Sequence, residues 1–482
     1  MTNALSRMLA PGALAILFAG CVTAPVPERT DHPWEPPSDA GAPGGSWDDL
    51  RQRQPDISKL PTLADLTDLA LHNSAATRKA WHDARAAAAQ VDKAQGLFMP
   101  ALTANAGGSR SGVSASPNSF DQQTLQYGPG LQLNYLVINF GGGRAAAVEQ
   151  ALQTVYAANH TFNRTIQDTL LNVETAYFNC ISAKAGADAA LATVADAKKA
   201  LEAAQARNTA GMGTALDVLQ AQAAYDQSLY SQAAAGGQLR VARGALALAA
   251  GLPADVPLVP ADPDTELPAS LGTNDVRRTI DEAIARRPDI AALRADLAAK
   301  RAANQVAHAS SWPNLYLNAN LNRPYYEAFT GTQQQGRREW TYGAGLNVQW
   351  DLFDGWQTES QIRTAEEQAQ AAAAVLEQAE LGASADVWTR YQNYETALQK
   401  YAFSLAFSKS AAAARDLAAE AYAAGLKTVL DLLTADAQLA SARSQQVAAR
   451  QEVFTALASL AYATGRLTAD TPEFSTRKDA KP

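Results

Sequence analysis

The chain has 482 residues, of which 47% are hydrophobic but only 7% aromatic, and alanine dominates its apolar content. This composition favours long helices that approach each other closely over a bulky globular core. The net charge of -8, from 40 basic and 48 acidic residues without a basic run, argues against nucleic acid as a partner. Two cysteines are too few for a disulfide framework, and neither has a neighbour at metal-ligand spacing.

The first residues, 1–20, have the pattern of a secretory signal peptide. Arg7 supplies a positive start, Leu9–Phe18 is a short apolar run, and small residues precede Cys21. The run is too short to span a bilayer as a lasting anchor. Its ending resembles a bacterial lipobox, although Phe18 stands where leucine is usual, so we expect Cys21 to be lipidated. Ordinary signal cleavage and a chance apolar start are the alternatives.

Residues 21–60 are rich in Pro, Asp and Gly and have scant periodicity, so they are predicted to form an extended tether that carries the lipid. Apolar residues then recur at helical spacing from Leu63 to about Gln95, which predicts a helix. Pro100 ends it. Cys180, farther along, lies in an amphipathic helical stretch and is expected to be a small buried apolar residue.

After the proline of each half, the apolar period changes from helix to strand. Apolar and polar side chains alternate over 314–321 and, more clearly, over 340–352. The same alternation is found over 125–137 and weakly over 102–110. Each half of the chain therefore carries two predicted strands.

Polar loops rich in Gly, Ser or Gln, near 111–123 and 330–337, join the strands of each pair. Strands of this length with aromatic ends suit a bilayer-spanning barrel, because lipid accepts strands only in a closed sheet. Four strands cannot close a useful barrel, whereas three chains with four strands each close a barrel of twelve. We therefore expect a homotrimer; a two-sided soluble sheet is the alternative.

Glycines end each strand pair, and helical composition then runs without proline to Ala210 and to Ala424. At 1.5 Å per residue, each helix would extend roughly 100 Å. Helices this long need partners along their length, and the Ala-rich pattern with scattered Gln, Glu and Lys suits coiled-coil packing. An ordinary helical bundle with kinks is the alternative.

A seven-residue segment occurs twice, at 211–217 and at 425–431, as Gly-x-x-Thr-x-Leu-Asp. The glycine can adopt the left-handed conformation that ends a helix, and the threonine and aspartate can form a capping box on the next helix. These pairs are Thr214 with Asp217 and Thr428 with Asp431. Each copy is therefore predicted to be a tight helix-turn-helix tip, and a cap role alone would account for its residues.

Other landmarks also recur in the same order, which indicates an internal duplication. Met99-Pro100 returns as Trp312-Pro313, and a glycine pair at 128 and 130 returns at 343 and 345. The predicted organisation is repeat 1 (61–255, with strands at about 100–140), a linker (256–277), repeat 2 (278–467, with strands at about 314–354) and a polar tail (468–482). The fold class is an α+β membrane protein.

With these elements, the chain after about residue 60 resembles the TolC-type outer-membrane efflux family. The resemblance includes the segments 287–290 (Arg-Pro-Asp-Ile) and 217–222 (Asp-Val-Leu-Gln-Ala-Gln). It implies a homotrimer with a twelve-stranded transmembrane β-barrel, continued by a long α-helical coiled-coil periplasmic barrel that closes at the tips. The lipobox and tether resemble the lipoprotein branch that serves resistance-nodulation-division pumps, which implies an outer-membrane, lipid-anchored location.

The resemblance also implies roles for residues at the tips. Asp431 falls where the family places an acidic ring at the periplasmic aperture, while the second acidic position is Thr434 here. Lys427, Asp217 and Tyr422 match the residues that lock the gate. The surface that would face a periplasmic adaptor comprises Gly211, Met212, Thr214, Gly425, Leu426 and Thr428.

The function that this resemblance implies is a passive exit duct of a tripartite efflux system, recruited by an adaptor and an inner-membrane pump. Two alternatives stay open: an exit duct for type I protein secretion, and a non-conducting lipid-anchored periplasmic scaffold. The five histidines are scattered and no nucleotide-binding glycine loop opens a helix after a strand. We therefore expect no enzymatic activity, cofactor or metal, and no sequence feature indicates the substrate.

Overall fold

The computed structural model describes residues 61–113, 122–262, 276–330 and 333–467. The predicted signal peptide, Cys21, the tether and the tail lie outside these residues, as does most of the linker. The described chain divides into two compact units. The first holds Asp83–Ala158 and Leu293–Val375, and the second holds the remainder.

The helices alternate between short segments and very long ones. In chain order they are α2 (Leu63–Asn73), α3 (Ala75–Gln95), the 3-10 turn η2 (Gly96–Phe98), α4 (Gly143–Thr209), α5 (Ala215–Ala249), α6 (Val276–Arg286), α7 (Pro288–Ala309), α8 (Gln357–Ala423) and α9 (Val429–Ala463). α4 and α8 have 67 residues each and end where the sequence predicts. The single helix predicted from Leu63 to Gln95 is wrong, because Ser74 is extended and its hydroxyl accepts the backbone N–H of Thr77 at 3.2 Å.

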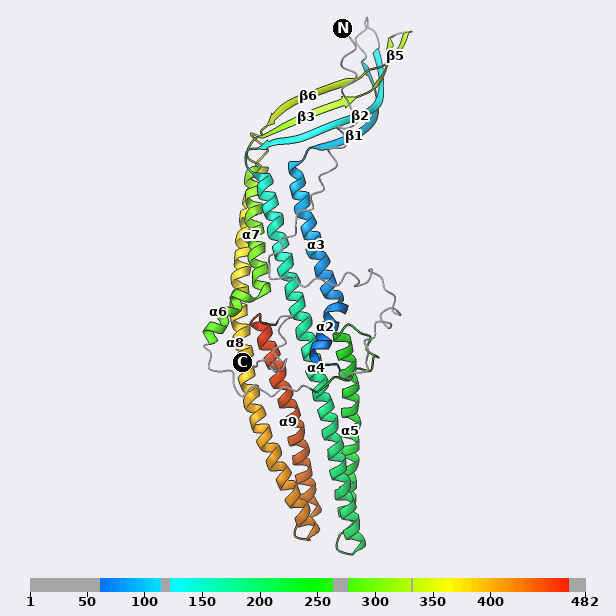
Figure 1. Ribbon diagram of the computed structural model, residues 1–482, viewed down its shortest axis with the longest axis vertical. Coiled ribbons are helices and arrows are strands. Elements are labelled where there is room, and N and C mark those ends of the chain that lie inside the picture. Colours follow the sequence, from blue (N-terminus) through cyan, green and yellow to red (C-terminus); the bar gives the residue numbers. More distant parts are fainter. Residues whose placement is uncertain (1–60, 114–121, 263–275, 331–332, 468–482) are drawn as a thin grey trace, which may run out of the picture. The chain divides into compact units, whose positions relative to one another are not determined.

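The strands belong to the first unit and form one antiparallel sheet (Figure 1). They are β1 (Ala101–Val113), β2 (Gln122–Asn139), β3 (Asn314–Asn322), β4 (Tyr325–Thr330), β5 (Gln333–Arg338) and β6 (Thr341–Gln349). β3 and β4 both pair with β2, β6 pairs with β3, and β5 pairs with β4. The sheet is therefore four strands wide, as predicted, with the third and fourth strands interrupted along their length.

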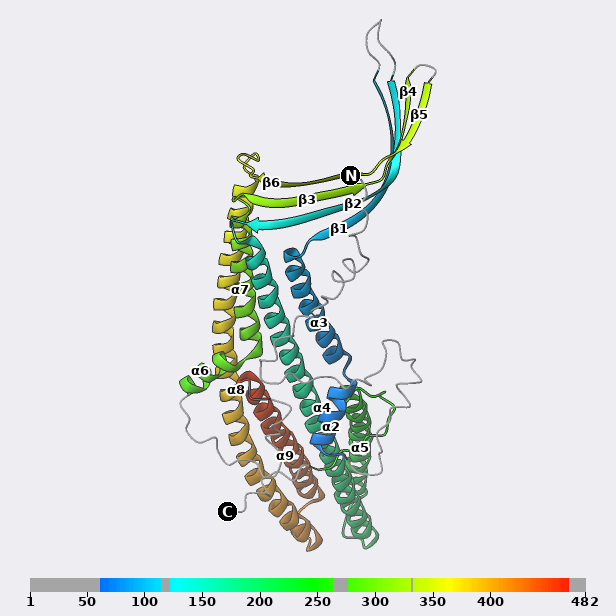
Figure 2. The same cartoon turned by 45° about the horizontal axis from the view of Figure 1, so that its top comes forward.

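One predicted loop is wrong. Residues 330–337 were expected to be a polar loop, but most of them lie in β5, and β4 continues beyond the predicted strand. Their Gln- and Arg-rich sequence lacks the apolar alternation of a half-buried strand, so periodicity could not identify it. The interruption between β3 and β4 falls at Pro324, which lacks an N–H for the ladder. Figure 2 shows the sheet bending where β3 gives way to β4.

One face of this sheet, which we call the apolar face, carries the alternating apolar residues. Leu131 of β2, Leu321 of β3 and Tyr342 of β6 lie directly opposite one another and so share it. Along β6 these residues stay uncovered within the chain: Tyr342 is 84% exposed, and Leu346 and Val348 follow at 68% and 62%. Such a face needs a nonpolar environment that the single chain does not provide.

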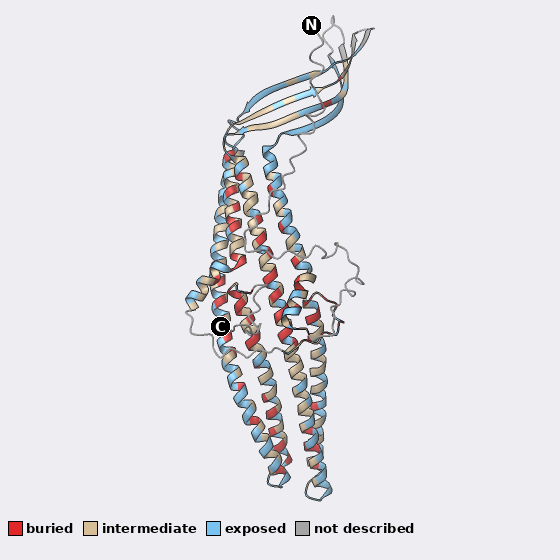
Figure 3. Ribbon diagram, viewed as in Figure 1, coloured by how far each residue is buried: buried red, intermediate tan, exposed pale blue. Residues whose placement is uncertain are grey.

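In the second unit, the long helices bury a stripe along the sides that face one another (Figure 3). One core cluster joins α4 to α9, where the rings of Phe178 and Phe454 stack with centroids 4.7 Å apart. Cys180 belongs to this cluster and is 1% exposed, which confirms its predicted role. No helix in the described ranges is long and apolar enough to cross a membrane.

Candidate gate at the helical tips

Both tips of the second unit turn through a left-handed glycine. Gly211 has φ 71° and Gly425 has φ 76°. In each tip, the backbone N–H of the glycine and that of the next residue donate to carbonyls in the last turn of the preceding helix. Met212 donates to the Arg207 carbonyl at 2.9 Å, and Leu426 donates to the Ala421 carbonyl at 2.9 Å. This pattern satisfies carbonyls that a helix end would leave unpaired.

The capping boxes predicted for α5 and α9 are confirmed. Thr214 accepts the backbone N–H of Asp217, whose carboxylate accepts the Thr214 N–H at 2.9 Å. The second copy repeats this geometry with Thr428 and Asp431 at 3.0 Å. Each aspartate is therefore held at the start of its own helix.

Asp431 is exposed and stays ionised readily. Hydrogen bonds from the backbone N–H and the hydroxyl of Thr428 lower the pKa of its carboxyl, and the charge of Lys427 lowers it further. The Lys427 ammonium lies 3.7 Å from the Asp431 carboxylate, within the same tip. Thr434, one turn along, uses its hydroxyl to bond the Leu430 carbonyl at 2.7 Å.

The ion pair that the resemblance implies between Asp217 and Lys427 is not among the ion pairs of the described residues. Each side chain is instead engaged within its own hairpin, Asp217 in its cap and Lys427 beside Asp431. A direct lock between these two residues stays a prediction.

A different side chain joins the two hairpins. The Arg207 guanidinium at the end of α4 donates to the carbonyl oxygen of Tyr422 in α8 at 2.5 Å, and it lies 4.9 Å from the centroid of the Tyr422 ring. Tyr422 is 4% exposed, and burial raises the pKa of its hydroxyl, with the Asp217 charge adding to this and Arg207 opposing it. Sequence reasoning missed Arg207. The equivalent position in the second repeat is Ala421, so the sequence does show that the arginine is specific to the first tip. That difference between the repeats could have pointed to Arg207.

A second link between the hairpins lies farther from the tips. Asp196 of α4 forms ion pairs with Arg415 of α8 at 3.2 Å and with Arg443 of α9 at 3.0 Å. Arg415 also bonds Asp436 of α9 at 2.9 Å. Burial raises the pKa of Asp436, and the hydrogen bond and charge of Arg415 only partly offset this effect. One carboxylate thus connects the first hairpin to both helices of the second.

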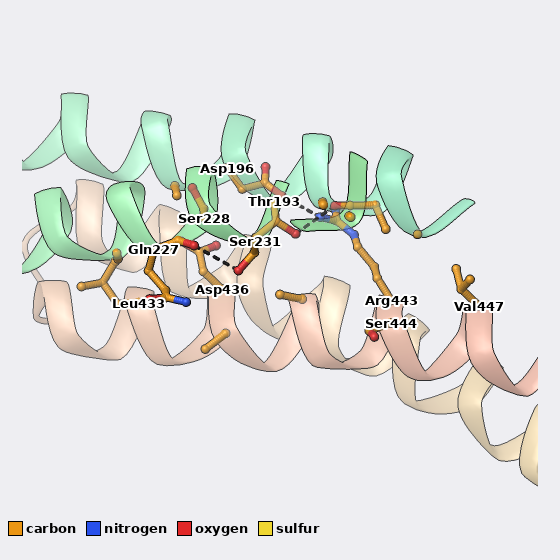
Figure 4. A pocket seen from close by; sticks show the side chains of 18 of the residues that line it. Thr193, Asp196, Gln227, Ser228, Ser231, Leu433, Asp436, Arg443, Ser444 and Val447 are labelled. Carbon is orange, nitrogen blue, oxygen red and sulfur yellow. Dashed lines mark hydrogen bonds and ion pairs between the residues drawn. The ribbon is translucent and has the colours of Figure 1, made fainter. Parts of the chain in front are cut away.

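This link borders a cavity of about 610 Å³ between α4, α5 and α9. Small residues line most of it, and Figure 4 shows the Arg443 side chain reaching toward Asp196. Toward the tips from this cavity, an apolar cluster that includes Leu201 of α4, Tyr422 of α8 and Leu432 of α9 also joins the two hairpins.

Several apolar side chains of the tips are exposed. Exposed apolar residues of the two tip segments are Met212, Leu216, Leu219, Leu426 and Leu430. Of these five residues, only Met212 and Leu426 were among the adaptor-facing residues that the resemblance implies. In the described part of the chain, no three His, Cys, Asp or Glu side chains gather as a metal site would require.

A family model described as "Outer membrane efflux protein" matches residues 66–252 and 279–466, which are the two repeats with their tips. The chain belongs to this family. Protein CyaE of Bordetella pertussis is 29% identical over 439 residues, covering 90% of each chain. The pyoverdine export outer membrane protein OpmQ of Pseudomonas aeruginosa is 30% identical over 273 residues, covering 54% of this chain and 56% of that protein.

The fold of this efflux family protein also matches solved structures. The outer-membrane channel OprN superposes with a TM-score of 0.74 at 25% identity, covering 84% of this chain and 90% of that one. The channel VceC of Vibrio cholerae gives a TM-score of 0.69 at 21% identity, covering 84% and 96%. The predicted α+β fold of the TolC type, with a sheet continued by long helices, is confirmed.

Proposed function

We propose that this protein is the passive outer-membrane exit duct of a tripartite efflux system, opened at its periplasmic tips by its partners. The observation that carries the proposal is the contact between the hairpins. The two tips are capped units joined by Arg207 to Tyr422 and by Asp196 to Arg415 and Arg443, beside a small apolar cluster. Family membership supplies the transport role. Opening would require a partner to replace these links, and because Asp196 and Arg415 are largely buried, separating them costs more than separating an exposed ion pair.

The assembly proposed is a homotrimer. The sheet of one chain is four strands wide with free edges at β1 and at β5 and β6, and its apolar face is exposed. Free edges and an exposed apolar face both disappear if three copies close a barrel in lipid. The same closure would bring the three pairs of tips around one axis.

At that axis, Asp431 would form the acidic ring of the aperture. It is exposed and its pKa is lowered, so three copies would concentrate negative charge in a narrow mouth and favour cations. Thr434 stands at the second position of the family, so a single ring is proposed. Asp217, Lys427 and Tyr422 remain the proposed gate residues, with Arg207 added to them.

The partners proposed are a periplasmic adaptor and an inner-membrane pump of the resistance-nodulation-division type. The exposed apolar side chains of the tips, such as Met212 and Leu426, offer an adaptor a surface with Gly211, Thr214, Gly425 and Thr428 between them. A lipid on Cys21 would anchor the assembly in the outer membrane. Cargo differs with the pump, and the relative OpmQ is named for pyoverdine export.

Single-channel conductance of the detergent-purified protein in a planar bilayer tests this function. We expect a small cation-preferring conductance in the wild type and loss of that preference in Asp431→Asn. Asp217→Asn, which alters the equivalent cap of the first tip, is the control for ion preference: as a gate-residue variant it can change how often the channel opens, but it should keep the cation preference. A protein that inserts but conducts without ion preference would contradict the aperture, and one that never inserts would favour the periplasmic scaffold.

A further inference from the structure

The apolar face of the sheet changes character at its end away from the helices. One row beyond Leu131 and Leu321, the backbone N–H of Arg323 bonds the Pro129 carbonyl at 3.0 Å, and the Arg323 guanidinium lies 5.1 Å from the centroid of the Trp340 ring. Arg323 lies between β3 and β4, but its bond to Pro129 continues the β2–β3 register, which places it on the same face as Leu321.

The next row repeats this combination of arginine and aromatic residues. Tyr127 of β2, Tyr325 of β4 and Arg338 of β5 lie opposite one another. The two tyrosine rings are 5.1 Å apart, and the Arg338 guanidinium lies 5.9 Å from the Tyr325 centroid. We call Arg323, Arg338, Tyr127, Tyr325 and Trp340 the outer cluster.

The spacing along the fourth strand indicates the depth of this cluster. Trp340 and Trp350 are ten residues apart and directly flank the two ends of β6, and both are exposed, at 60% and 57%. Ten residues extend about 33 Å along a strand, or about 25 Å across a membrane at the usual tilt of a barrel strand. That height equals the apolar band of outer-membrane barrels, which aromatic residues border on both sides.

The orientation follows from the chain. Trp350 lies near the start of α8, which continues into the helices that the proposed function places in the periplasm, and its indole N–H donates to the Ser311 carbonyl at 3.1 Å. Trp340 and the outer cluster therefore lie at the outer boundary of the apolar band.

The arginines of the outer cluster carry charge that the described residues do not neutralise by an ion pair. Arg337, the neighbour of Arg338 on the opposite face of β5, does pair with Glu339 at 3.3 Å. On the cluster's own face the nearest acidic position is Glu327, half-buried in the row beyond Tyr325. A guanidinium that rests on a ring still presents its N–H groups at its edge.

We propose that Arg323 and Arg338 bind phosphate groups of the glycolipid that forms the outer leaflet, with Trp340 and Tyr325 at the boundary of its acyl region. Arginine matches phosphate with paired, charge-assisted hydrogen bonds. Two guanidinium groups on adjacent strands and adjacent rows suit a headgroup that carries more than one phosphate. The inference rests on the outer-membrane location proposed above.

The test measures thermal stabilisation of the detergent-purified wild-type assembly by bisphosphorylated lipid A and by dephosphorylated lipid A. We expect the phosphorylated form to bind at least tenfold more tightly. The double variant Arg323→Gln with Arg338→Gln should lose this difference. Arg337→Gln, which removes the adjacent arginine of the opposite face, should keep it.

Equal binding of both lipids by the wild type, or an unchanged preference in the double variant, would overturn the proposal. Loss of the preference in Arg337→Gln as well would also overturn it. If the double variant does not assemble, the variant Arg323→Lys with Arg338→Lys is used instead. It keeps both charges, so it should keep part of the preference for the phosphorylated lipid. Complete loss of that preference in an assembled lysine variant would reject the proposal.

Two controls separate the sources of an effect. Inorganic phosphate should not reproduce the stabilisation, because the lipid's acyl chains contribute to binding at the aromatic residues. The conductance of the double variant should equal that of the wild type, since the cluster faces away from the lumen. If the wild type does not conduct at all, the proposed duct function is refuted. The lipid-binding measurement then decides the lipid proposal separately.

Discussion

The Arg207 guanidinium joins the two hairpins of the second unit by bonding the Tyr422 carbonyl oxygen at 2.5 Å and resting on the Tyr422 ring. It also lies 3.4 Å from the carbonyl oxygen of Met212, so it supports the turn of its own tip. The side chain therefore couples the shape of one tip to the position of the other.

Replacing Arg207 should loosen the gate more than replacing Lys427. Arg207→Ala removes a contact between hairpins, whereas Lys427→Ala removes only a contact within one tip. We expect a larger or more often open single-channel conductance in Arg207→Ala and a smaller change in Lys427→Ala. The reverse order would return the lock to Lys427 and Asp217.

The sequence predicted the elements whose signals are local. The ends of α4 and α8 and both capping boxes follow from glycine, threonine and aspartate within a few residues of each other. The role of Arg207 could not be predicted, because its acceptor is a backbone carbonyl that only the packing of α8 against α4 brings near. The β5 strand was missed for a related reason, since its polar residues gain their order from pairing with β4.

The cation preference of the channel should persist in mildly acidic solution. Within each chain, Thr428 and Lys427 lower the pKa of Asp431 from its ordinary value of about 3.9, and this opposes the rise that three neighbouring carboxylates impose on one another. We therefore expect the carboxylates to stay charged from pH 8 to about pH 5. Reversal potentials across a salt gradient, measured over this range, should be constant in the wild type. A preference that disappears near pH 6 would mean that another group, such as a histidine, controls selectivity.

The buried arginine at the start of repeat 2 should be important for stability. Arg287 is 8% exposed and bonds Asp289 at 2.7 Å and Asp386 of α8 at 3.0 Å. Removing one partner of a buried ion pair costs about 3 to 5 kcal/mol. We expect Arg287→Met to lower the thermal midpoint by several degrees. Arg278→Met, which removes an exposed arginine of α6, should change it little.

This network also gives stability a defined pH dependence. Burial opposes ionisation of Asp289, but hydrogen bonds from Arg287 and the charge of Arg164 outweigh it and lower the pKa. Because the pKa of Asp289 is lower in the folded state than in the unfolded state, this group stabilises the protein at pH values above the unfolded pKa. That stabilisation is lost as pH falls through the folded pKa. Thermal midpoints of the wild type should drop below about pH 4. In Arg287→Met the drop attributable to Asp289 should be smaller.

The two acids of the second link should respond differently to neutralisation. The raised pKa of Asp436 means that its charged form is disfavoured by burial, so its contribution to stability is greatest at low pH and is lost as pH rises through the folded pKa. Asp436→Asn therefore removes a cost at pH 7 as well as a contact with Arg415, and we expect a small change in thermal midpoint.

Asp196→Asn removes the acceptor that Arg415 and Arg443 share, and it should lower the midpoint clearly more than Asp436→Asn at pH 7. Since Asp196 connects α4 to both α8 and α9, the variant should also raise the open fraction of the channel, as Arg207→Ala does. Equal midpoints for the two variants would mean that the acids contribute alike. A lowered midpoint with unchanged gating would assign Asp196 to stability and leave the gate to Arg207 and Tyr422.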